Sequence, residues 1–353
     1  MPRLHVLLGA GGVGKTTLAA GYALALARAP ERRVGLLGID PSRRLKDALH
    51  VTLGDADTSV PSAGVLRAAL LQPAQSLRRW AAEASPDPAA RERLLVNPFF
   101  TALADRLATA TDIFAAARVA EWAERDPALT DLVVDTAPGL NAIEFLTRPE
   151  RLAAFLGGRL VGWLRWVARR GAGDSSVGLL RGGAQRIVGS LGRIAGARLL
   201  FDLADFFALV DAMFAQMLAR VQVTQRWLRD PRTQILVVTS VRHDGAQTAK
   251  ELVGALSQAR LVARAVVVNR ALPAGLVDQR EALESTVASD SSAGPVIRYA
   301  LAYAAMQARV VDGARGLAAS TIAVPDARGL DGDARLESLT RLGEVLRAGL
   351  ERG

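Results

Sequence analysis

The chain has 353 residues, half of them hydrophobic and 22% charged, which is the composition of a globular protein and not of a disordered one. It contains no cysteine, so disulfides and thiolate metal ligands are excluded, and we expect a cytoplasmic protein. The net charge of +9 is no argument for nucleic acid by itself, because all but three of the 44 basic residues are arginines, a skew that we attribute to GC-rich coding.

The first predicted element is a buried strand over residues 3–8. Because this strand runs into a glycine turn, we do not interpret the first residues as a signal peptide. Residues 9–16 then read GAGGVGKT, the pattern G-x-x-x-x-G-K-[ST], and a helical stretch follows directly. Glycines let backbone amides turn toward phosphate oxygens, and the helix N-terminus adds partial positive charge. We expect Lys15 to bridge the outer phosphates of a nucleotide and the Thr16 hydroxyl to bind Mg²⁺. The alternative is a glycine-rich turn without a ligand.

Five further buried strands alternate with helical stretches along the chain. They cover residues 34–40, 132–138, 234–239, 263–269 and 321–325. This alternation predicts an α/β fold with a doubly wound parallel sheet, whose ligands lie at the carboxyl ends of the strands. Asp40 and Asp135 fall at such ends, and Asp135 is expected to hold Mg²⁺ through water. For both aspartates a helix N-cap is the alternative role.

Six segments match the motifs of one family in order. They are residues 9–17, 40–49, 135–138, 228–240, 266–273 and 324–330. In them the chain resembles the arsenite-pump ATPases and their relatives, the guided-entry ATPases that target tail-anchored membrane proteins. The resemblance implies a single P-loop ATPase domain over residues 1–353, with ATP and Mg²⁺ as ligands. It is weakest over residues 50–130 and 150–225.

The resemblance also implies roles for individual residues. The nucleotide-binding residues of the loop would be Gly11, Gly12, Val13, Gly14, Lys15, Thr16 and Thr17. Asp40, in the first switch, would orient the attacking water as a catalytic residue beside Lys15, and would join Thr16 and Asp135 at the metal. Asn269 would read the adenine edge, since an amide can both donate and accept, and Pro325 would bind the cofactor with it. Taken without the resemblance, Asn269 is an ordinary loop residue.

Two motifs depart from the family pattern. Where the family carries a lysine that reaches across a dimer to the partner's nucleotide, this chain has Ala10. That change predicts slow hydrolysis, a cation supplied by a related partner chain, or substitution by Arg43 or Arg44. In the second switch the family's histidine is replaced by Asn141, which predicts a different coupling between nucleotide state and client region.

The expected partner is a second ATPase chain, in a homodimer or in a heterodimer with a related ATPase. Because the chain has no cysteine, such a dimer must close without a cysteine-bound zinc ion. The same absence excludes arsenite or antimonite as a ligand, since these soft metalloids need thiolates.

A helical client subdomain is expected as insertions at about residues 90–125 and 150–228. Residues 151–198 carry nine arginines and one acidic residue, so nearly all of the net charge lies there. The segment favours contact with a membrane surface, with a solvated insert as the alternative, and no reading motif favours nucleic acid. The three aspartates of residues 199–221 do not share one helical face, so apolar residues surround the expected helix. With Met213 and Met217, this is typical of a groove for a hydrophobic segment or of plain core.

The sequence therefore predicts a dimeric ATPase that couples its nucleotide state to the handling of hydrophobic protein segments. Two alternatives remain. One is a weakly hydrolysing regulatory subunit of a heterodimeric ATPase, which Ala10 favours. The other is a partitioning-type ATPase acting on a membrane or DNA surface, because that class shares the phosphate loop and the sheet.

Overall fold

The computed structural model describes residues 1–39, 44–61, 64–84, 87–97, 100, 111–139, 213, 215–273, 279–288, 294–326 and 334–352. The chain divides into two compact units, which are taken separately below. The first comprises Met1–Leu71, Glu121–Leu146 and Gln225–Gly353, and the second Gln72–Ala120 and Thr147–Thr224. Asp40, Arg43, Asn141 and the arginine-rich segment 151–198 lie outside the described residues.

The first unit is built on an eight-stranded sheet with the order β3-β4-β2-β5-β1-β6-β7-β8. Its strands are β1 (Arg3–Gly9), β2 (Val34–Gly38), β3 (Thr58–Ser59), β4 (Leu66–Leu70), β5 (Asp131–Asp135), β6 (Gln234–Ser240), β7 (Ala263–Ala271) and β8 (Ser320–Pro325). Every neighbouring pair is parallel except β3 with β4. The predicted α/β fold is confirmed, while β3 and β4 are strands that the sequence did not predict.

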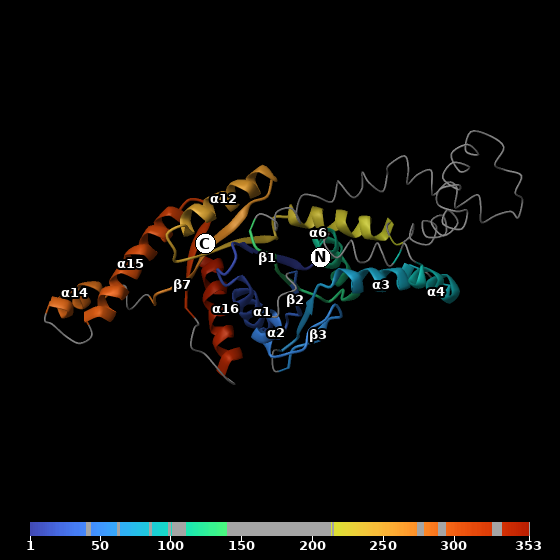
Figure 1. The fold of residues 1–353 in the computed structure, drawn as a ribbon, viewed down its shortest axis with the longest axis horizontal. Coiled ribbons are helices and arrows are strands. Elements are labelled where there is room, and N and C mark those ends of the chain that lie inside the picture. The colour runs from blue at the N-terminus through green and yellow to red at the C-terminus, as the bar shows by residue number, and fades with distance from the viewer. Residues whose placement is uncertain are drawn as a thin grey trace, which may run out of the picture. The chain divides into compact units, whose positions relative to one another are not determined.

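Helices cover both faces of this sheet, as a doubly wound fold requires (Figure 1). One face is covered by α1 (Lys15–Ala27), α2 (Arg44–Leu49) and α16 (Ala334–Arg352). The other is covered by α12 (Gly245–Gln258) and α15 (Gly294–Ala314), and α14 (Arg280–Ala288) packs against α15. Because α1 packs on the sheet and is flanked on the same face by α2 and α16, nearly all of its side chains are buried, and it shows no amphipathic stripe.

Helices α1 and α16 approach each other through glycine (Figure 1). A Cβ atom on Gly343 would collide with the carbonyl oxygen of Gly21, and one on Gly21 would collide with the carbonyl oxygen of Leu339. The two backbones therefore touch directly, and this contact brings α16 down onto the helix that follows the phosphate loop.

The second unit is helical where it is described. It contains α3 (Pro73–Ala84), α4 (Pro88–Val96) and most of α6 (Thr111–Arg125). The rings of Trp80 and Phe114 stack with their centroids 5.5 Å apart. Met213 and Met217 are 0% and 1% exposed, so these two side chains are core and do not line an open groove. In the parts of the chain that are described, no helix combines the length and the apolar character needed to cross a membrane.

A buried ionic cluster joins β1 to β5 at the amino edge of the first unit's sheet. His5 Nε2 lies 3.0 Å from Asp131 Oδ1, and Tyr22 Oη lies 3.3 Å from His5 Nδ1. Arg32 Nη1 and Thr130 Oγ1 also donate to the Asp131 carboxylate, at 3.2 and 2.8 Å. Burial by itself raises the pKa of Asp131, but the hydrogen bonds from His5 and Thr130 and the charge of Arg32 outweigh it and hold the pKa below its usual range.

We expect Asp131→Asn to lower the free energy of unfolding at pH 7 by about 1–3 kcal/mol, because it weakens a buried charged network. A lowered folded-state pKa contributes stability above the unfolded pKa of about 4, and this contribution is lost as the pH falls through the folded value. Urea unfolding at pH 7 and in acid should therefore show that the difference in unfolding free energy between the wild type and Asp131→Asn becomes smaller in acid. The control is Glu344→Gln, which breaks the exposed Arg28–Glu344 pair and should cost under about 1 kcal/mol. A difference in unfolding free energy that does not change with pH would contradict the lowered pKa of Asp131.

Candidate nucleotide-binding site

The loop between β1 and α1 has the backbone that a phosphate-binding turn requires. Gly12 and Gly14 have φ angles of 76° and 90°, in the left-handed region that side chains with a Cβ atom rarely adopt. Gly14 is the N-cap of α1, no side chain caps the helix, and its first turn holds no acidic residue. The partial positive charge of this helix end is therefore left for an anionic ligand.

Lys15 bends back over the loop that precedes it. Its ammonium donates hydrogen bonds to the carbonyl oxygens of Gly9 at 2.9 Å and Ala10 at 3.0 Å, and the residue is only 6% exposed. The buried charge thus lies above the turn, where the motif places a lysine that meets phosphate oxygens. Its contact with the phosphates of a nucleotide stays a prediction.

A pocket of about 330 Å³ opens at this carboxyl edge of the sheet. It is lined by Gly12, Gly14, Lys15, Thr16, Thr17, Arg44, Asp47, Ala48, Thr136, Pro138 and Arg270. The lining contains three cationic residues, three threonines and one carboxylic acid, so it favours a polyanionic ligand. Arg44, which the sequence offered as a substitute for the missing lysine, is among them.

The segment after β5 is tied to the end of β1. Thr136 Oγ1 donates to the carbonyl oxygen of Leu7 at 2.7 Å, and the Gly139 amide donates to that of Gly9 at 2.9 Å. These bonds hold Asp135, the last residue of β5, beside β1 at the same edge of the sheet, where it is 2% exposed.

The residues present fit Mg²⁺. The Thr16 hydroxyl and the Asp135 carboxylate are oxygen ligands of the kind this ion takes from a protein when phosphates and water supply the others. Among the described residues no group of three His, Asp or Glu side chains gathers. Asp40, the third predicted ligand, lies outside the described residues.

Asn269 is bound to the phosphate loop itself. Its Nδ2 donates to the carbonyl oxygen of Val13 at 2.8 Å, and the residue is 6% exposed. Pro325 ends β8 and lies opposite Ala271 in the strand pairing. Neither Asn269 nor Pro325 lines the phosphate pocket, so their adenine-binding roles stay predictions.

The sequence missed Arg270, which lines the phosphate pocket from the end of β7. The signal in the sequence is its position directly after Asn269 in the segment 266–273. A residue next to a predicted ligand on a strand is normally assigned to the opposite face, and only the geometry described below places it beside the loop.

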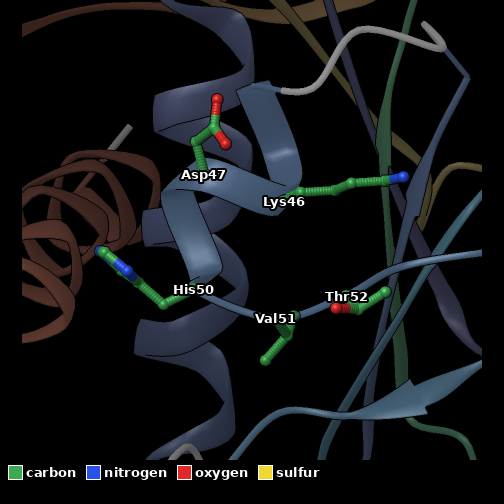
Figure 2. Close-up of a pocket in the computed structure, with 5 residues that line it drawn as sticks. All are labelled: Lys46, Asp47, His50, Val51 and Thr52. Atoms are coloured by element: carbon green, nitrogen blue, oxygen red, sulfur yellow. The ribbon is translucent and has the colours of Figure 1, made fainter.

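A second pocket beside α2 is wider, at about 550 Å³, but lacks the features of a site. Figure 2 shows Lys46 and His50 pointing to opposite sides and Asp47 pointing away from both. Because polar groups must converge to fix a ligand, we assign no function to this pocket. Its lysine serves below as a control for Lys15.

A mostly parallel sheet with a glycine-rich loop and a lysine between its first strand and first helix defines a P-loop NTPase of the α/β class. Residues 3–169 match the model of the anion-transporting ATPase family of the ArsA type, which confirms the resemblance seen in the motifs.

An uncharacterized protein of Streptomyces coelicolor is 30% identical to the chain over 290 residues. The aligned region covers 77% of this chain and 63% of that relative, so the chain spans less than two thirds of the relative's length. The relative's description names no activity, and the likeness carries none to this chain.

Two glycines of the loop allow a matched test of its anchoring. A Cβ atom on Gly14 would collide with Asn269 Nδ2, whereas one on Gly12 would meet nothing within 4 Å. Both alanine variants should lose about 1–2 kcal/mol of unfolding free energy from the left-handed backbone. Gly14→Ala should lose about 1–3 kcal/mol more, because Asn269 must release Val13. Urea unfolding measures both, and the extra loss should vanish in an Asn269→Ala background. Equal losses in Gly12→Ala and Gly14→Ala would contradict this anchoring.

Proposed function

We propose that this protein is an ATPase that binds and hydrolyses MgATP. The observation that carries the proposal is the pocket that the left-handed turn of residues 12–14 lines together with Lys15, Thr16, Arg44 and Arg270. Such a pocket suits a chain of phosphates, and the family match supplies ATP as the ligand.

Each residue's part follows from its position. Lys15 exchanges the carbonyl oxygens of Gly9 and Ala10 for phosphate oxygens and so offsets negative charge on the outer phosphates. Thr16 and Asp135 would hold Mg²⁺, which neutralises the phosphates when bound. Orientation of the attacking water is proposed for Asp40 from the family motif.

We expect Lys15→Met to lower kcat/KM for MgATP about 10²-fold or more, because it removes a charge aimed at the transferred phosphoryl group. Lys46→Met is the matched control: it removes a lysine from the neighbouring pocket of Figure 2, and turnover should stay at the wild-type value. Release of phosphate measures the turnover of each variant, and calorimetry measures its affinity for the nucleotide. Wild-type turnover equal to the blank would overturn the proposal of hydrolysis, and equal losses in both variants would overturn the role of Lys15.

A weakly hydrolysing regulatory subunit is the second candidate, and Ala10 is the observation that favours it. Its side chain packs against the hydrophobic core and brings no charge to the loop. On this alternative, Ala10→Lys should raise a low turnover about tenfold or more, while the ATPase proposal expects measurable turnover before the change. Mass measurement with and without nucleotide, alone and with a lysine-bearing relative, separates the homodimer from the heterodimer.

The finer part of the proposal is that the nucleotide state of a dimer controls the capture and release of a hydrophobic protein segment. It is supported by the resemblance to guided-entry ATPases and by Leu95 and Val96, which are 37% and 72% exposed at the end of α4 in the second unit. Cross-linking of an apolar helical peptide should depend on whether ATP or ADP is bound.

Sedimentation with anionic vesicles, before and after arginines in 151–198 are changed to glutamine, tests the membrane contact. Thiolate-bound metalloid is not part of the proposal, because the chain has no cysteine.

A further inference from the structure

Arg270 sits in an irregularity of the sheet. The pairing of β7 with β8 shifts register between Asn269 and Ala271, and Arg270 between them has a φ of 60°. In a regular strand two consecutive side chains point to opposite faces, whereas a bulge re-aims one of them. Here Asn269 bonds to Val13 of the phosphate loop and Arg270 lines the pocket that the same loop forms.

The bulge is held from α15. Tyr303 Oη donates to the carbonyl oxygen of Arg270 at 2.7 Å, and the Leu272 amide donates to Gln307 Oε1 at 2.6 Å. A left-handed backbone is unfavourable for a residue with a Cβ atom, and it persists where surrounding bonds fix it, as at ligand-binding positions. Two bonds from one helix therefore keep an arginine in a conformation that glycine would adopt more easily.

Arg270 lies at the edge of the pocket where a phosphate ligand would bind. The side chain is half-buried and lines the pocket formed by Gly12, Gly14 and Thr16. It also borders a smaller space of about 150 Å³ next to Tyr303. Among the residues that the structure describes, no carboxylate forms an ion pair with it. A planar guanidinium can donate two hydrogen bonds to one phosphate group, which suits it to this place.

We propose that Arg270 is a phosphate-binding residue of this site, whose guanidinium contacts the polyphosphate of the nucleotide together with Lys15. It thereby supplies, within the same chain, positive charge that Ala10 does not provide. The inference rests on the proposed nucleotide-binding function and adds to it a residue that neither the motifs nor the family match assigned.

Three variants distinguish a structural role of Arg270 from a role in binding phosphate. Arg270→Gly removes the guanidinium, suits the φ of 60° and keeps the carbonyl that Tyr303 bonds to. Arg260→Gly is the matched control, because Arg260 has a φ of 58° and is exposed in the turn before β7, outside the phosphate pocket. Arg270→Lys keeps one charge and loses the planar fork.

The experiment is calorimetric binding of MgATP and of sodium tripolyphosphate to the full chain at two ionic strengths. Arg270→Gly should weaken binding of both ligands about tenfold or more, with the larger loss at low salt. Arg270→Lys should fall between wild type and the glycine variant, and Arg260→Gly should bind as wild type does. Thermal unfolding midpoints of the two glycine variants should be equal, which a structural role for Arg270 alone would not give.

The outcomes separate this inference from the proposed function. Wild-type affinity in both Arg270→Gly and Arg270→Lys would overturn the inference and leave the ATPase proposal standing. Binding of tripolyphosphate that depends on Arg270, without binding of ATP, would overturn the ATPase proposal and support the inference. A wild-type chain that binds neither ligand would overturn both. If Arg270→Gly fails to fold, wild-type affinity in Arg270→Lys and Arg270→Gln decides against the inference, and graded loss decides for it.

Discussion

One buried hydrogen bond, from Asn269 Nδ2 to the carbonyl oxygen of Val13, anchors the candidate phosphate loop. It joins the end of β7 to the phosphate loop, across the strand β6 that separates β7 from β1. The bond is possible only because Gly14 has no Cβ atom in the space that the amide occupies. The bond thus ties the left-handed turn at the start of α1 to the carboxyl end of β7.

The charged groups at the amino ends of the parallel strands differ from those at the carboxyl ends. Strand β5 shows both arrangements, one at each of its ends. It begins at Asp131, whose carboxylate is held inside the protein by a hydrogen bond with His5 and by the charge of Arg32. It ends at Asp135, on the edge where Lys15 and two arginines line a pocket. Internal pairing at the amino edge contributes to stability, whereas the cationic surplus at the carboxyl edge is suited to an external anion. Because the strands are parallel, their direction alone separates the two tasks.

The sequence predicted what local patterns encode. Apolar runs marked β1, β2 and β5 to β8, and the glycine-lysine motif located the site before any contact was known. It missed β3, which has two residues, and β4, whose five residues include Arg67 and so do not form a continuous apolar run. The Gly21–Gly343 contact was also beyond reach, because it joins helices far apart in the chain and depends on their packing.

Arg270 shows why a site is harder to predict than a motif. Nothing in the segment 266–273 marks a bulge, since the register shift arises from pairing with β8 and from bonds donated and accepted by α15. Those same bonds connect the cationic edge to α15, so the conformation of the β7 end and the seating of this helix depend on each other. A ligand that binds the guanidinium of Arg270 would stabilise the bulge. Because Tyr303 of α15 donates to the carbonyl oxygen of Arg270 in this bulge, the ligand and the helix would stabilise the same conformation. Substitution in α15 can therefore act on the phosphate pocket without touching it.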